Sequence, residues 1–152
     1  MSSTGLDVFD KTLQATNIWL GEIGADLAVD RQASWHALGA VLRAVRDRMP
    51  VGLAAHLGAQ LPLLVRGAYY EQFQPASEPQ TYRTVDDFLD VVAAGLRGAD
   101  VVDPEEAARA VFGVLNHYVD PGQVANVRDA MPAEVRSIWP AGPSDLAMGS
   151  AA

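Results

Sequence analysis

Prolines divide the middle of this chain into short helical segments. In the stretch Val45–Tyr70, Pro50 ends one arginine-bearing segment and Pro62 interrupts the next. Proline does this because it lacks an amide hydrogen and its ring clashes with the preceding helical turn. Apolar residues recur at three- and four-residue steps along the chain, which is the periodicity of a helix, and no stretch shows the alternation that a strand needs. We therefore predict an all-α fold class, a compact bundle of about eight helices.

Local signals place the starts of the helices. Side chains that can accept a hydrogen bond from a first helical turn stand at four expected starts: Asp30, Thr84, Asp103 and Asp120. The first helix is expected over residues 6–27 and the fourth, after Pro62, to about Gly67. On the first helix, five apolar residues share one face and are expected to be buried: Phe9, Leu13, Leu20, Ile23 and Leu27. On other helices, four residues are expected in the core: Leu42, Leu57, Phe112 and Val127.

A shift of 70 residues brings two parts of the chain into register. Residues 35–69 align without a gap on residues 105–139. The shared residues of the first part are Ala37, Ala40, Val41, Gly52, Ala55, Pro62, Val65 and Arg66. Two helical patterns can also match by chance, which is the alternative. The alignment predicts two pseudo-repeated helical units, and the arginines Arg66 and Arg136, which recur, are expected to bind backbone carbonyls at a kinked helix end.

This repeat and the proline-containing segment between its copies suggest a division of the chain. We expect a first helical unit over residues 6–70, a linker over 71–83 and a second helical unit over 84–140. Residues 1–5 and 141–152 are expected to be a flexible lead and a flexible tail. The two units together are expected to form one compact domain.

Three parts of the first unit carry a resemblance to a known family. They are LRAVRDRMP (Leu42–Pro50), AAHLGAQLPLLVRGAYY (Ala54–Tyr70) and the proline that follows, Pro75. Over residues 9–140 the chain resembles the prokaryotic domain-of-unknown-function family 2267, although members of that family often have tryptophan where this chain has Phe73. The resemblance implies a mostly helical fold and no established activity, and it brings no catalytic residue to any position of this chain.

Charge and composition narrow the range of partners. The net charge is −8, which argues against nucleic acid and against anionic membranes, because both are bound by cationic surfaces. There is no cysteine, so there is no disulfide framework and no thiolate metal site. The N-terminal residues are polar, and no run approaches the roughly 20 apolar residues that span a bilayer. We expect a cytoplasmic protein.

No motif for catalysis, metal or cofactor stands out. The histidines His36, His56 and His117 are far apart in the sequence and match no metal-ligand spacing. The acidic residues around Asp87 and Glu105 occupy helix starts, where capping and the helix dipole account for them. We therefore expect no catalytic residue, no metal and no cofactor.

The two units differ most at polar positions, and that difference suggests a binding surface. Arginines and tyrosines are frequent anchors of interfaces. The residues expected to border the surface are Arg46, Arg48, Gln60, Tyr69 and Tyr70; the alternative is that they only seat the linker. The arginine group of Arg43, Arg46 and Arg48, beside Asp47, could contact an anion or an acidic peptide; the alternative is a solvated helix end, where the dipole favours cations. We expect a non-enzymatic module that binds a protein partner or a small ligand. A small enzyme with an Arg/Tyr/His site near the linker is the alternative, and the sequence leaves a homodimer open.

Overall fold

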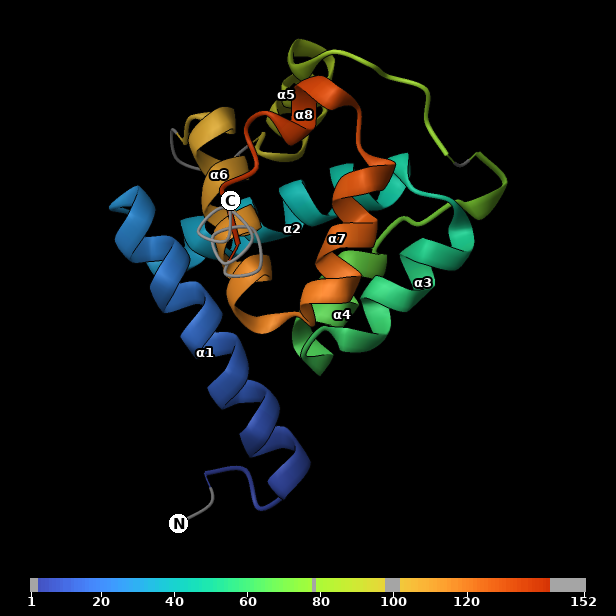
Figure 1. Ribbon diagram of the computed structural model, residues 1–152. Helices are drawn as coiled ribbons and strands as arrows, with labels where there is room; N and C mark the ends of the chain where they lie inside the picture. Colours follow the sequence, from blue (N-terminus) through green and yellow to red (C-terminus); the bar gives the residue numbers. More distant parts are fainter. Residues whose placement is uncertain (1–2, 78, 98–101, 143–152) are drawn as a thin grey trace, which may run out of the picture.

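The computed structural model describes residues 3–77, 79–97 and 102–142. These residues form eight α-helices and one short 3-10 turn, Pro75–Ser77, and contain no strand (Figure 1). The helices are α1 Asp7–Leu27, α2 Arg31–Arg48, α3 Val51–Gln60, α4 Leu63–Tyr70, α5 Val85–Gly95, α6 Pro104–Tyr118, α7 Pro121–Ala130 and α8 Ala133–Arg136. The predicted all-α class is confirmed. Residues 1–2 of the expected lead and 143–152 of the expected tail lie outside the described residues.

The predicted capping residues begin their helices as expected. Asp30 accepts a hydrogen bond from the amide of Ala33 at 2.8 Å. Thr84, Asp103 and Asp120 do the same for α5, α6 and α7. The expected end of the fourth helix near Gly67 is wrong, because α4 continues to Tyr70. Arginine side chains of α2 bind the carbonyl groups of this last turn and complete it.

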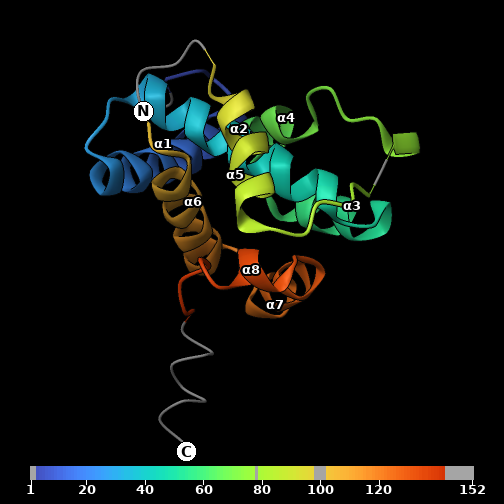
Figure 2. The same ribbon diagram turned by 90° about the horizontal axis from the view of Figure 1, so that it is seen from above.

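Two long helices, α2 and α6, pack against each other at the centre of the bundle (Figures 1 and 2). The helix α1 contacts both of them, α5 contacts both from another side, and α3 lies beside α7. The four residues that the sequence placed in the core are all buried there, which confirms that prediction: Leu42, Leu57, Phe112 and Val127. The ring of Phe112 stacks on Trp139 with centroids 3.9 Å apart.

The N-terminal end of α1 extends beyond the central helices α2 and α6 (Figure 1). Phe9 and Leu13 are 47% and 38% exposed, so the prediction that they are buried is wrong. The buried face of α1 instead consists of Thr12, Thr16, Trp19, Leu20 and Ile23. The first turn of α4 meets this face at Thr12, whose Oγ1 accepts a hydrogen bond from the Leu64 amide at 3.2 Å. Phe9 lies on the same side of α1 as the buried Thr16, so its exposure comes from its place near the N-terminal end of the helix, where no neighbouring helix covers it, whereas Leu13 lies at the edge of the buried face.

Several local features recur at a distance of 70 residues. The bounds of α3 and α7 differ by this number at both ends. Arg66 Nη2 donates to the Leu61 carbonyl at 3.1 Å, and Arg136 Nη1 donates to the Met131 carbonyl at 2.6 Å. The predicted carbonyl-binding role of these two arginines is confirmed, while the duplication of a whole unit stays a prediction. Within the described residues, no helix combines the length and the apolar character needed to cross a membrane.

Candidate functional site

A buried arginine of α2 holds the start of the linker, residues 71–83. Arg46 is only 3% exposed, and its Nη1 donates to the carbonyls of Tyr69 at 2.6 Å and Glu71 at 2.7 Å. Its Nε donates to Asp47 Oδ1 at 2.8 Å, and its guanidinium lies 5.0 Å from the ring centroid of Phe73. Arg46 thus joins α2 to the end of α4 and to the first residues of the linker.

The far end of the linker is held by Arg48, two residues after Arg46 on α2. Arg48 Nε donates to the Tyr82 carbonyl at 3.0 Å and lies over the Tyr82 ring. The Tyr82 hydroxyl in turn donates to the Ala44 carbonyl at 3.0 Å. A backbone hydrogen bond of 2.7 Å from Gln80 to the Asp47 carbonyl lies between these contacts. Arg46 and Arg48 therefore hold opposite ends of the linker against one helix.

The two predicted tyrosines pack where α4 ends. Tyr69 is fully buried and its hydroxyl donates to the Ala54 carbonyl at 2.7 Å. Burial raises the pKa of Tyr69, so its hydroxyl stays protonated and keeps donating. The Tyr70 ring meets Tyr69 edge-on, and its hydroxyl lies so close to Gly58 that a side chain there would collide with it. Gln60 makes a separate contact, accepting a hydrogen bond from the Asp120 amide at 3.0 Å.

A hollow of about 300 Å³ opens beside this arginine group, between α2, α5 and the start of the linker. Its lining residues are Ala40, Arg43, Ala44, Arg46, Asp47, Gln72, Val91, Ala94 and Gly95. Of the five predicted site residues, only Arg46 lines it. The small residues let the two helices approach closely, and a Cβ on Gly95 would lie 2.9 Å from that of Ala40.

Arg43 also lines the hollow; it belongs to the arginine group singled out from the sequence, but it was not among the five residues expected to border a binding surface. Its Nη1 donates to the Ala68 carbonyl at 3.1 Å and lies 3.7 Å from Glu71 Oε2. Burial lowers the pKa of Arg43 and the nearby Arg46 lowers it further, while Glu71 and Asp47 raise it. Its position needs Gly39, where a Cβ would lie 2.8 Å from Nη1. Helical spacing in the sequence indicates that Arg43 lies beside Arg46 and Asp47. Residues three and four apart share one face of a helix, and Arg43 is three residues before Arg46 and four before Asp47.

One backbone torsion at the rim of the hollow is unusual. Gln72 has a φ of 58°, in the left-handed region that residues other than glycine seldom occupy. This conformation turns the chain from α4 into the linker and brings Gln72 to the hollow. Backbone torsions of this kind are concentrated at functional sites. Gln72 therefore adds a polar group to the two arginines and Asp47.

Comparison with known proteins identifies the family. The family model for uncharacterized conserved proteins of domain-of-unknown-function family 2267 matches residues 16–138. The chain belongs to this family. The resemblance noted from its sequence is thereby confirmed, and no curated protein matches the chain.

This member of family 2267 has no histidine at the hollow. His36 and His56 are exposed on α2 and α3. His117 lies at the end of α6, where its Nδ1 is 2.7 Å from Glu22 Oε2 on α1. Among the described residues, no group of three or more histidine, aspartate or glutamate side chains is arranged to hold a metal ion. The chemical groups at the hollow are therefore two guanidinium groups, one carboxylate and one amide.

Proposed function

We propose that this protein is a non-enzymatic binding module whose hollow between α2 and α5 accepts a small anionic ligand, anchored by Arg43. The proposal rests on a difference between Arg43 and Arg46 in the number and closeness of their hydrogen-bond and ion-pair partners. Arg46 donates to the carbonyls of Tyr69 and Glu71 and forms an ion pair of 2.8 Å with the carboxylate of Asp47. Arg43 has one carbonyl and a carboxylate at 3.7 Å, on a Glu71 side chain that is 69% exposed.

The electrostatics of Arg43 favour an incoming anion. Neither its Nε nor its Nη2 forms a hydrogen bond with another described residue. Because burial disfavours the charged form of this side chain, a ligand carboxylate would relieve part of that cost. Hydrogen bonds to a charged group contribute about 1.5–3 kcal/mol, which is more than a distant, solvent-exposed partner such as Glu71 supplies.

The size and lining of the hollow indicate which anions would fit. Its volume lies at the lower end of the range for ligand pockets, roughly 300–1,000 Å³. The apolar part of the lining comes from α2 and α5: Ala40, Ala44, Val91, Ala94 and Gly95. A short aliphatic carboxylate would place its carboxylate on Arg43 and its carbon chain on these residues. The enzyme alternative gains no support here, since no histidine lines the hollow.

Calorimetric titration of the full chain with acetate, succinate and inorganic phosphate tests this function. We expect succinate to bind, and Arg43→Gln to weaken its binding at least tenfold. Glu71→Gln should strengthen binding severalfold, because it removes the carboxylate that competes for Arg43. The matched control is Arg109→Gln, an exposed arginine on α6 paired with Glu105, which should leave binding unchanged. Binding by none of the three anions, or equal binding by Arg43→Gln, would refute the proposal.

A further inference from the structure

Two opposite charges on one face of α2 line the hollow without pairing with each other. Arg43 and Asp47 are four residues apart, so their side chains lie about one turn apart on the same face, and both line the hollow. Residues at this spacing can form an ion pair along a helix, but these two described side chains form none. Arg43 instead donates to the Ala68 carbonyl, and Asp47 accepts from Arg46. The hollow therefore presents a cation and an anion that are held apart.

Asp47 keeps one oxygen atom open to a ligand. Its Oδ1 accepts the hydrogen bond from Arg46 Nε, whereas its Oδ2 has no hydrogen-bond or ion-pair partner among the described residues. The Asp47 side chain is 26% exposed, and Oδ2 is not among the enclosed polar atoms of the described residues that lack a partner. The Gln72 side chain is exposed at the rim and forms no hydrogen bond with a described residue. Two acceptor oxygens, Asp47 Oδ2 and Gln72 Oε1, are therefore within reach of a ligand in the hollow.

The formal charges around Arg43 already balance. The charged side chains that act on it are those of Glu71, Arg46 and Asp47, so two arginines face two carboxylates. A ligand with only a carboxylate leaves this group with one excess negative charge, whereas a ligand with one carboxylate and one ammonium group keeps it neutral. Salt screens partly buried charges less than exposed ones. The balance of charge therefore favours a zwitterion over a simple anion.

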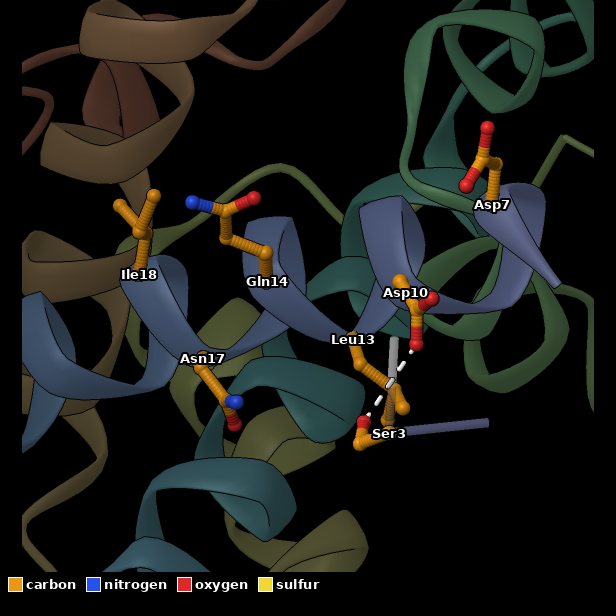
Figure 3. Close-up of a pocket in the computed structure, with 7 residues that line it drawn as sticks. All are labelled: Ser3, Asp7, Asp10, Leu13, Gln14, Asn17 and Ile18. Carbon is orange, nitrogen blue, oxygen red and sulfur yellow. Dashed lines mark hydrogen bonds between the residues drawn. The ribbon is translucent and has the colours of Figure 1, made fainter. Parts of the chain in front are cut away.

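A larger depression of about 660 Å³ on the outer side of α1 lacks such a pair of open charges (Figure 3). One carboxylate in its lining, Asp10, accepts hydrogen bonds from the hydroxyls of Ser3 and Thr4 at 3.4 and 2.8 Å. Its Asn17 accepts another from Arg31 at 2.6 Å, and no lysine or arginine is among its described lining residues. The hollow between α2 and α5 is therefore the better site for a ligand that carries both charges.

We infer, on the basis of the proposed function, that the ligand of the hollow is a small zwitterionic amino acid, with its carboxylate on Arg43 and its ammonium group on Asp47 Oδ2 and Gln72 Oε1. Hydrogen bonds in which both partners are charged are stronger than neutral ones. The Cβ atoms of residues four apart on a helix are separated by about 5–6 Å, and the charged ends of extended 4-aminobutyrate are about 5 Å apart at ordinary bond lengths. The carbon chain of such a ligand lies over Ala44, which also lines the hollow.

Calorimetric titration of the full chain with 4-aminobutyrate and with pentanoate, in which a methyl group replaces the ammonium group, tests this inference. We expect 4-aminobutyrate to bind at least tenfold more tightly than pentanoate. Asp47→Asn, whose amide oxygen can still accept from Arg46, should weaken 4-aminobutyrate binding at least tenfold without weakening pentanoate binding. Arg43→Gln should weaken the binding of both ligands. The matched control Asp129→Asn changes an exposed aspartate of α7 and should leave both affinities unchanged.

Different results would overturn this inference and the proposed function. If pentanoate or succinate binds and 4-aminobutyrate binds no more tightly than pentanoate, the anion site stands and the ammonium contact is wrong. Equal binding of 4-aminobutyrate by wild type and by Asp47→Asn, with far-UV circular dichroism showing the variant to be folded, also overturns the inference. Binding of none of these ligands would refute the proposed function and the inference together.

Discussion

Three arginines of α2 make different contacts although they are close in sequence. Arg46 is enclosed and gives its hydrogen bonds to backbone carbonyls and to Asp47. Arg48 holds Tyr82. Arg43, about one turn before Arg46, binds the Ala68 carbonyl and lines the hollow. The planar guanidinium with its several donors suits the enclosed position of Arg46, and the proposed ligand site depends on Arg43 being less enclosed than Arg46.

Replacing Arg46 by alanine should lower the free energy of unfolding by about 3–5 kcal/mol, because the carbonyls of Tyr69 and Glu71 and the carboxylate of Asp47 would lose a buried cation. Urea denaturation followed by circular dichroism measures this loss. The control Arg109→Ala removes an exposed pair within one helix and should cost less than about 0.5 kcal/mol. Equal losses for the two variants would show that the buried contacts do not stabilise the linker.

The packing of helix pairs in this bundle depends on how closely the two backbones can approach each other. On α5, Gly95 lies against Ala40 of α2, and a Cβ there would come within 2.9 Å of the Ala40 Cβ. On α6, Gly113 has no atom within 4 Å of the position that a Cβ would take, apart from its chain neighbours and the nearby backbone of its own helix. The first glycine is therefore needed for the α2–α5 contact that forms the hollow, whereas the second costs helix stability without a packing reason.

Gly113→Ala should raise the free energy of unfolding by about 0.5–1 kcal/mol, the helix-propensity difference between the two residues. Gly95→Ala should lower it by about 1–3 kcal/mol, because α5 must move away from α2. Thermal and urea unfolding of the two single variants measure both changes. If both variants are stabilised, the α2–α5 contact is looser than the structure indicates.

The two proposed units are held together because each has a helix that packs against the long central helix of the other. The helix α1 packs on α6, and α5 packs on α2. Each proposed unit thus supplies a helix that covers the long central helix of the other. Side chains from both parts meet where the Trp19 ring of α1 stacks on the Tyr118 ring of α6, with centroids 5.9 Å apart. Each half therefore covers part of the apolar surface of the other.

Separate fragments of residues 1–77 and 78–152 should therefore be largely unfolded and should become helical when mixed. Each fragment alone exposes the faces that the other fragment covers. Far-UV circular dichroism of the fragments, alone and in equimolar mixture, measures the gain of helix on mixing. Cooperative unfolding of fragment 1–77 by itself would show that the first unit is an independent domain.

Local chemistry was sufficient to predict much of this structure. The caps at Asp30, Thr84, Asp103 and Asp120 act within one turn, and the prolines interrupt helices through their own ring and missing donor. Arg66 and Arg136 bind carbonyls only five residues away. Because such contacts join residues that are close in the chain, the sequence by itself determined the helix starts, the all-α class and the role of these two arginines.

Tertiary structure alone decided what each helix face meets. Arg46 binds carbonyls 23 and 25 residues away, and these contacts extend α4 to Tyr70. The hollow exists only where α2, α5 and the linker converge. Phe9 and Leu13 follow the same helical period as the buried Leu20, yet no neighbouring helix covers them. Periodicity shows which residues share a face, whereas burial depends on a distant part of the chain that packs there.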